Sequence, residues 1–165
     1  MRTPLVSSTT RIISYHIIND EATSRLPVTI GVLADPELFP SRLIPLLQLS
    51  LKHETDVHVF FKNDTATSSE QEFLISYLQQ VNRSHQVHVV PVNRVQRMWG
   101  MSNVWIVFPV MQYFHDIRPD QKWFVIMDDN TYLLMNAVRR LLMEVGRNTT
   151  HGEQPVYMGT PLVDV

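Results

Sequence analysis

The chain of 165 residues contains no cysteine, few glycines and no long apolar run. Without cysteine it can form neither a disulfide framework nor a thiolate metal site. Gly31 and Gly100 stand alone, so no glycine-rich phosphate loop of the Walker or dinucleotide type is present. No stretch reaches the roughly 18 apolar residues of a transmembrane helix, and the N-terminus lacks the apolar segment of a signal peptide. These absences exclude several common classes of site and anchor from the sequence given.

The charge balance is also close to neutral. Fourteen lysines and arginines oppose sixteen acidic residues, which gives a net charge of −2. A protein that binds nucleic acid needs a basic surface, and this composition does not supply one. With 44% hydrophobic and 18% charged residues, the chain has the composition of a folded domain. We therefore expect a globular domain with no nucleic-acid partner.

Short apolar runs alternate along the chain with segments of helical periodicity. We predict an N-terminal extension over residues 1–26 and a single domain over residues 27–165. Within that domain the predicted strands are 28–34, 57–61, 87–92, 123–127 and 156–158, and a helical segment follows each of the first four. Strands that alternate with helices are typical of an α/β fold with a mostly parallel sheet flanked by helices.

Several local signals refine the predicted helices. Ser69 is expected to cap the second helix, and Gly146 is expected to end the last one. Pro109 falls inside the third helical segment, where a kink or break is expected. Arg139 and Arg140 are interpreted as part of a solvated helix face.

The carboxyl ends of the strands are the places to look for a site, because ligands of open α/β sheets bind there. The turns concerned are Ala34-Asp35, Lys62-Asn63-Asp64 and Asp128-Asp129-Asn130. Two adjacent carboxylates after a buried strand repel each other unless a cation or hydrogen-bond donors compensate them. A divalent metal that bridges a diphosphate would do so. The alternative is that Asp128 to Thr131 only cap the next helix, and on spacing alone this is the commoner case.

The surrounding sequence resembles a known family. PDQKWFVIMDDNTYLL, residues 119–134, is similar to the signature of the fringe-like glycosyltransferases, which include the fringes and the core-1-type β1,3-galactosyltransferases. The similarity continues to the Pro155–Gly159 segment and is looser between residue 27 and the signature. It implies a GT-A-like, Rossmann-like fold, of which this chain would hold the N-terminal half and be incomplete on the C-terminal side. The implied reaction moves a hexose, of galactosyl or N-acetylglucosaminyl type, from a UDP-sugar to a glycan or glycoprotein acceptor.

The same resemblance implies roles for individual residues. Asp128 and Asp129 would contact the ribose and the sugar of the donor. Asn130, together with Asp128, would bind Mn²⁺ beneath the diphosphate. Asp64 would lie near the uracil, and Arg42 near the donor site. Full-length relatives are type II membrane proteins, so the resemblance also implies the Golgi or endoplasmic reticulum lumen.

Two positions depart from the family pattern. Asn130 stands where an aspartate is usual, and an amide oxygen brings no negative charge, so we expect weaker affinity for Mn²⁺. Leu33 stands where fringes place a basic residue. The sequence offers no candidate for the general base, so no catalytic residue is assigned. An alternative hypothesis is therefore a non-catalytic relative that binds a UDP-sugar or a protein.

Two further features bear weakly on function. Three glycosylation triplets, which begin at Asn63, Asn82 and Asn148, are compatible with a secretory location. The seven histidines form no convincing ligand set. His85 and His88 straddle the start of one predicted strand, His53 and His58 flank the start of another, and each is interpreted as a solvated or satisfied side chain.

Overall fold

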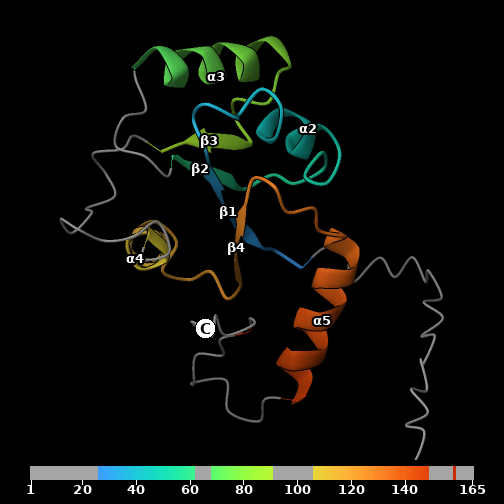
Figure 1. Cartoon of the computed structure of the whole chain (residues 1–165). Coiled ribbons are helices and arrows are strands. Elements are labelled where there is room, and N and C mark those ends of the chain that lie inside the picture. The colour runs from blue at the N-terminus through green and yellow to red at the C-terminus, as the bar shows by residue number, and fades with distance from the viewer. Residues whose placement is uncertain (1–25, 62–67, 91–105, 149–157, 159–165) are drawn as a thin grey trace, which may run out of the picture.

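The computed structural model describes residues 26–61, 68–90 and 106–148, together with Met158. Four strands, β1 (Thr29–Ala34), β2 (Val57–Phe61), β3 (Val87–Val89) and β4 (Phe124–Asp128), form one parallel sheet in the order β3-β2-β1-β4 (Figure 1). The predicted α/β fold with a parallel sheet is confirmed. The predicted extension over residues 1–26 and the predicted strand at 156–158 fall outside the described residues, apart from Leu26 and Met158.

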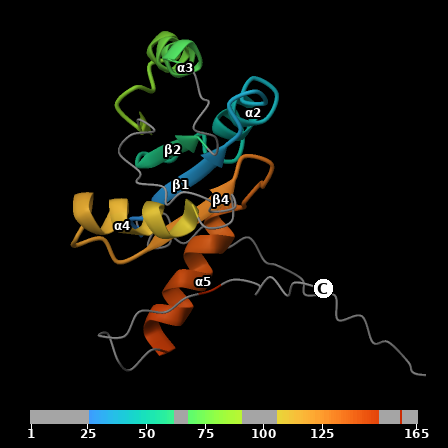
Figure 2. The same cartoon turned by 60° about the vertical axis from the view of Figure 1, so that its left-hand side comes forward.

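Helices cover both faces of this sheet. They are α2 (Leu43–Gln48), α3 (Ser68–Gln80), α4 (Val107–Ile117) and α5 (Met135–Asn148). Side chains of α2, α3 and α5 pack with Ile30, Val32, Val57 and Val59 in one buried cluster. The α4 side chains pack with Leu33 and Phe60 in a second cluster on the other face. Figure 1 shows α4 across β1 and β4 from α2 and α5, as this three-layer arrangement requires, and Figure 2 shows the molecule with its α4 side turned forward.

The close approach of α4 to the sheet depends on a glycine in the central strand. A Cβ atom at Gly31 would lie only 3.0 Å from Cε2 of Phe114 and 3.4 Å from Cε2 of Phe60. These rings fill the volume that a side chain on β1 would occupy, and such an overpacked core would be destabilised. Gly31 is thus required for packing and belongs to no phosphate loop.

Three predicted details of the helices need correction. Pro109 lies in the first turn of α4, where the missing N–H has no helical partner to lose, so no kink arises there. Gly146 does not end α5, which continues to Asn148. Helix α3 begins at Ser68, so Ser69 lies within its first turn. No helix of the described ranges is long and apolar enough to cross a membrane.

Helix α3 ends in a hydrogen-bonded turn that presents Arg83 to the core. The N–H of Asn82 donates to Gln79 O at 3.0 Å, and the N–H of Arg83 donates to Leu78 O at 2.8 Å. Asn82 has a positive φ of 55°, as the residue after a helix often does. This turn directs the Arg83 guanidinium toward backbone carbonyls in the last turn of α2 and in the segment after it.

Arg139 is not on a solvated face, contrary to the sequence interpretation. Its side chain is 12% exposed and forms a two-pronged ion pair with Glu54, which is 5% exposed. Nη1 of Arg139 donates to Oε1 of Glu54 at 3.0 Å, and Nε donates to Leu26 O at 3.2 Å. The pair ties α5 to the segment between α2 and β2.

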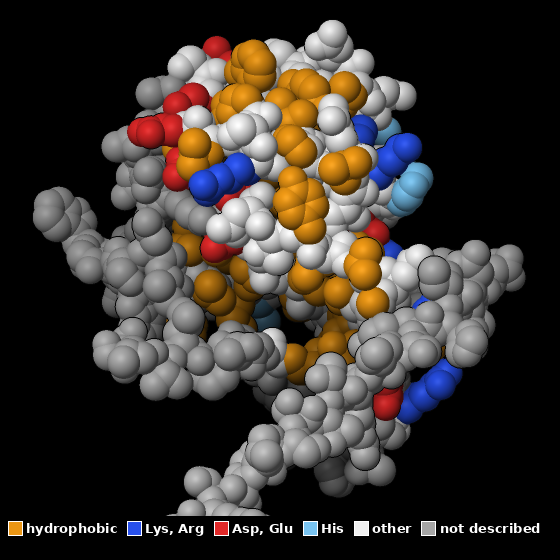
Figure 3. All heavy atoms as spheres, turned by 45° about the vertical axis from the view of Figure 1, so that its right-hand side comes forward, with side chains coloured by type: hydrophobic (Ala, Val, Ile, Leu, Met, Phe, Trp, Pro, Cys, Tyr) orange, Lys and Arg blue, Asp and Glu red, His pale blue; other side chains and the backbone are white. Residues whose placement is uncertain are grey.

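Large apolar side chains remain exposed beside the loop that follows β4. Leu49 is 70% exposed, Leu134 is 81% exposed and Tyr132 is 55% exposed. In the view of Figure 3, which brings the α2 side of the molecule forward, hydrophobic side chains gather on the described surface. Exposed apolar side chains therefore lie on the loop between the Asp128–Asn130 turn and α5.

Candidate functional site

The strand order creates a switch point at the carboxyl ends of β1 and β4. From β1 the chain moves outward to β2 and β3, and it then returns to place β4 on the other side of β1. Leu33 pairs with Asp128 in the register of these two strands. In open α/β sheets the crevice at such a point is where ligands bind. The Asp128-Asp129-Asn130 turn follows β4 at this position.

Asp129 joins the two strand ends. Its N–H donates to Leu33 O at 3.1 Å, and its Oδ2 accepts a hydrogen bond from the N–H of Asp35 at 3.0 Å. The residue is fully buried. Since a buried carboxylate needs hydrogen-bond donors, the Asp35 amide supplies part of its compensation. Asp129 therefore has a structural contact, and its implied contact with a donor sugar stays a prediction.

The neighbours of Asp129 are more open. Asp128 is half-buried, and Asn130 is exposed. The N–H of Thr131 donates to Asp128 O at 3.0 Å, while its hydroxyl donates to Oδ1 of Asn130 at 3.3 Å. These contacts hold the turn in place, and they leave the amide of Asn130 at the surface.

The helix-cap interpretation of these acids is wrong. Helix α5 begins at Met135, and its first turn contains no acidic residue. Residues 131–134 separate the acids from that helix without joining it. Because an N-cap lies immediately before the first residue of a helix, Asp128 and Asp129 are too far from Met135 to cap α5.

Ser50 holds the loop between the turn and α5, a contact that the sequence did not indicate. Its hydroxyl accepts from the N–H of Leu133 at 3.0 Å and donates to the carbonyl of the same residue. The two residues are 83 positions apart. The loop is thus fixed to the end of α2, which limits the movement of the turn that precedes it.

Arg42 and Asp64 are the other predicted site residues. Arg42 lies immediately before α2, and the N–H of its backbone donates to Leu38 O at 3.0 Å. This segment follows the carboxyl end of β1, and the implied position of Arg42 near the donor site stays a prediction. Asp64 lies outside the described residues. Leu33 is buried in the cluster under α4.

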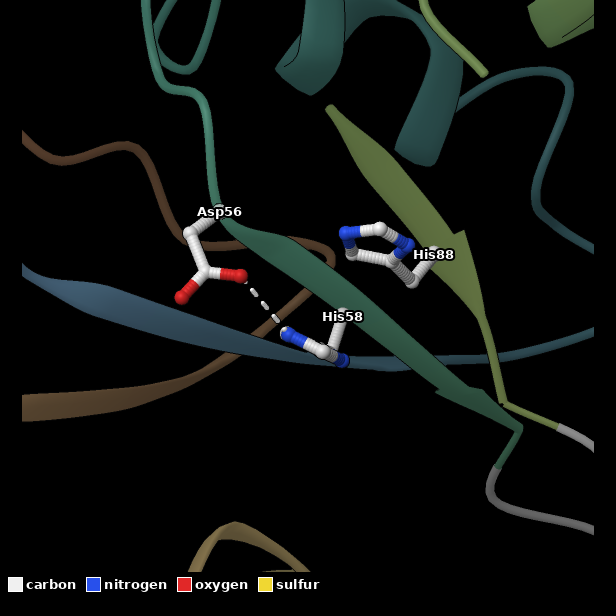
Figure 4. A group of neighbouring side chains, drawn as sticks. All are labelled: Asp56, His58 and His88. Atoms are coloured by element: carbon white, nitrogen blue, oxygen red, sulfur yellow. Dashed lines mark hydrogen bonds and ion pairs between the residues drawn. The ribbon is translucent and has the colours of Figure 1, made fainter. Parts of the chain in front are cut away.

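A second group of polar side chains lies on the α4 face, at the amino-terminal half of β2 and β3. Asp56, His58 and His88 each offer one ligand atom, and these atoms lie within 4.8 Å of one another. Oδ1 of Asp56 is 3.0 Å from Nε2 of His58. Figure 4 shows the carboxylate and the two rings turned toward a common point. The interpretation of each histidine as a solvated or satisfied side chain missed this group.

The environment of the group shifts two pKa values downward. Burial lowers the pKa of His58 from 6.5 to about 4, against the opposing effect of its hydrogen bond to Asp56. Burial alone would raise the pKa of Asp56, but hydrogen bonds from Arg118, Thr29 and His58 outweigh it and lower the value from 3.8 to about 2. At neutral pH the group therefore contains a carboxylate beside a neutral imidazole.

The low pKa of His58 makes stability depend on pH. As the pH falls from about 6.5 to about 4, the unfolded chain protonates His58 while the folded protein does not. The free energy of unfolding of the metal-free protein is therefore expected to fall over this window, by about 3 kcal/mol from this residue. Urea unfolding at a series of pH values measures the slope.

His115 provides a matched control for this slope. It is exposed and lies 3.3 Å from the carboxylate of Asp116. The His58→Gln variant should lose the extra slope, whereas His115→Gln should keep it. Equal slopes in the wild type and in His58→Gln would contradict the expected role of His58.

Comparison of the chain with protein-family models, with curated proteins and with solved structures finds no match in any of the three.

Proposed function

We propose that the chain is the donor-binding part of a hexosyltransferase, which takes a UDP-sugar and serves transfer of its sugar to a glycan or glycoprotein acceptor. The observation that carries the proposal is the position of Asp128-Asp129-Asn130 at the switch point between β1 and β4. The fringe-like signature over residues 119–134 supplies the chemical identity of the ligand. A secretory location, in the Golgi or endoplasmic reticulum lumen, belongs to the same proposal.

The side chains of the turn suit a hard divalent cation such as Mn²⁺. Asp128 and Asn130 provide a carboxylate and an amide oxygen at the surface of the turn, and oxygen ligands are what Mn²⁺ prefers. Asp129 supports this arrangement from beneath through its bond to the Asp35 amide. A bound Mn²⁺ would neutralise the charge of the donor diphosphate. Because Asn130 replaces the usual aspartate, Asp128 supplies one carboxylate charge where the family has two, and the site is expected to bind the ion weakly.

The second candidate is a relative that binds the UDP-sugar, or a protein, without transferring the sugar. The uncharged Asn130 and the buried Leu33 favour it. The transferase and a non-catalytic binder of the UDP-sugar require the same donor site and differ in turnover, whereas a binder of protein does not require that site. Release of UDP in the presence of glycan acceptors would support the transferase, and donor binding without release would support the second candidate.

Calorimetric titration of the whole chain with UDP, with and without Mn²⁺, tests the shared donor site. We expect binding that depends on the metal and is abolished by EDTA. Loss of one charge-assisted contact costs about 1.5–3 kcal/mol, so Asp128→Asn should weaken UDP–Mn²⁺ binding roughly tenfold or more.

Asp120→Asn is the matched control. Asp120 is exposed and precedes the amino end of β4, so it is at the opposite end of the same strand. Its replacement should leave the affinity unchanged. A folded sample that binds no UDP in the presence of Mn²⁺ would overturn the proposal.

A further inference from the structure

We propose that Asp56, His58 and His88 bind one divalent transition-metal ion of the Zn²⁺ type. The three side chains bring a carboxylate oxygen and two imidazole nitrogens within 4.8 Å of one another. Figure 4 shows that all three point into the same space rather than away from it. This convergence gives a single ion three ligands from the protein.

The backbone already holds these ligands in place. His58 and His88 are register partners on neighbouring parallel strands, so both side chains leave the sheet on the same face. Their ring centroids are 4.8 Å apart. Asp56 is two residues before His58, and its carboxylate is fixed by the Thr29 hydroxyl at 2.6 Å. An ion would therefore bind to a prearranged set of ligands with little ordering of side chains.

The ligand set selects the class of metal. Two imidazoles and one carboxylate suit Zn²⁺ and its neighbours in the transition series, whereas Mg²⁺ and Mn²⁺ favour sites made of oxygen. His58 is 2% exposed, and its Nδ1 has no hydrogen-bond partner among the described residues. The nitrogen of His58 that would bind the ion is therefore Nε2, which faces Asp56. Three protein ligands leave a further coordination position for water.

Arg118 competes with a metal for Asp56. Its Nη2 donates to Oδ1 of Asp56 at 3.1 Å, and its Nε donates to Oδ2 at 3.3 Å. The Arg118 side chain is 41% exposed, so it can turn into solvent when an ion takes its place. The Thr29 hydroxyl keeps Oδ2 positioned in either state. Binding of the ion thus replaces the positive charge of Arg118 beside the Asp56 carboxylate by the positive charge of the metal.

The site stands apart from the proposed donor site. His58 pairs with Gly31 in the sheet register, and Asp35 follows four residues later in the chain, which corresponds to about 13 Å along a strand. The two groups also differ in ligand chemistry, since one is built of oxygens and the other contains two imidazoles. The inference therefore holds or fails independently of the proposed function.

Calorimetric titration of the whole, EDTA-stripped chain with Zn²⁺ tests the site. We expect one ion to bind per chain, and His88→Gln to weaken binding roughly 100-fold or more, because it removes a direct ligand. Arg118→Gln should tighten binding roughly tenfold, since it removes a competing charge. His115→Gln, which alters an exposed histidine beside Asp116, should change nothing.

The ring nitrogens give a second measurement that needs no variant. In long-range ¹H–¹⁵N spectra of the wild type, Zn²⁺ should shift the ring signals of His58 and His88 and leave those of His115 in place. Failure of the wild type to bind Zn²⁺, equal binding by His88→Gln, or unchanged His58 and His88 ring signals would each overturn the proposal.

Discussion

Replacement of Glu54 by alanine is expected to lower the free energy of unfolding by about 3–5 kcal/mol. The reason is the charge that the change leaves behind. Glu54 and Arg139 are 5% and 12% exposed and bond through both carboxylate oxygens. Without Glu54, the guanidinium of Arg139 keeps its bond to Leu26 O but loses its counter-charge in a buried position. Urea unfolding followed by circular dichroism measures the loss.

Two comparisons separate this cause from a general effect of truncation. Glu144→Ala removes an exposed carboxylate from the same helix, α5, and should change stability by less than about 0.5 kcal/mol. A double variant, Glu54→Met with Arg139→Met, removes both charges and should recover a large part of the loss. The single Glu54→Ala variant leaves Arg139 unpaired. A double variant whose free energy of unfolding is as low as that of the single variant would contradict the explanation by an unpaired buried charge.

Arg83→Ala is the second change with a large expected effect, about 4 kcal/mol. The guanidinium donates to three backbone carbonyls, Leu47 O at 2.7 Å, Leu51 O at 3.0 Å and Glu54 O at 3.0 Å. Each carbonyl left without a donor costs about 1–3 kcal/mol, less where water can enter. Arg83 thereby joins the end of α3 to the segment after α2. Thermal and urea unfolding of the variant test this.

The geometry of the guanidinium matters as much as its charge. Arg83→Lys keeps the charge but cannot reach three separate carbonyls, so it should recover less than half of the loss. Lys52→Ala removes an exposed cation from the same segment and should be close to neutral. Wild-type stability in Arg83→Lys would show that the fork of hydrogen bonds is not what stabilises this joint.

The parts of the fold that follow from local pattern were predictable. Apolar, β-branched runs marked β1 and β2, which lie in the interior of the sheet. A similar run marked β4, although this strand lies at the edge of the described sheet and is not the buried strand expected. The alternation with helices identified a parallel sheet. The rule that ligands bind at strand ends also drew attention to Asp35 and Asp129. Those two residues are joined in the structure by a hydrogen bond.

Contacts between residues far apart in sequence were not predictable. Arg139 has the spacing of a surface residue on an amphipathic helix, yet it pairs with Glu54, 85 positions away. Periodicity reports how polar a helix face is, and it cannot report that a buried partner will meet one arginine. Pro109 was misplaced for a simpler reason, because α4 begins at Val107 and the proline therefore lies in its first turn.

The histidine group contained a signal that could have been used. His58 and His88 both stand in a Val-His-Val triplet, at the second position of β2 and of β3. Neighbouring parallel strands place equivalent positions side by side, so identical triplets at the same register predict adjacent imidazoles. What the sequence lacked was the pairing of β2 with β3 and the position of Asp56 beside them.

The most direct test of the proposed donor site is the location of Mn²⁺ on the protein in the presence of UDP. The ion is paramagnetic and broadens the amide signals nearest to it in ¹H–¹⁵N spectra. We expect UDP-dependent broadening at Asp35 and at residues 128–130, with Asp120 at the opposite end of β4 unaffected. UDP-dependent broadening elsewhere, or none at this turn, would contradict it.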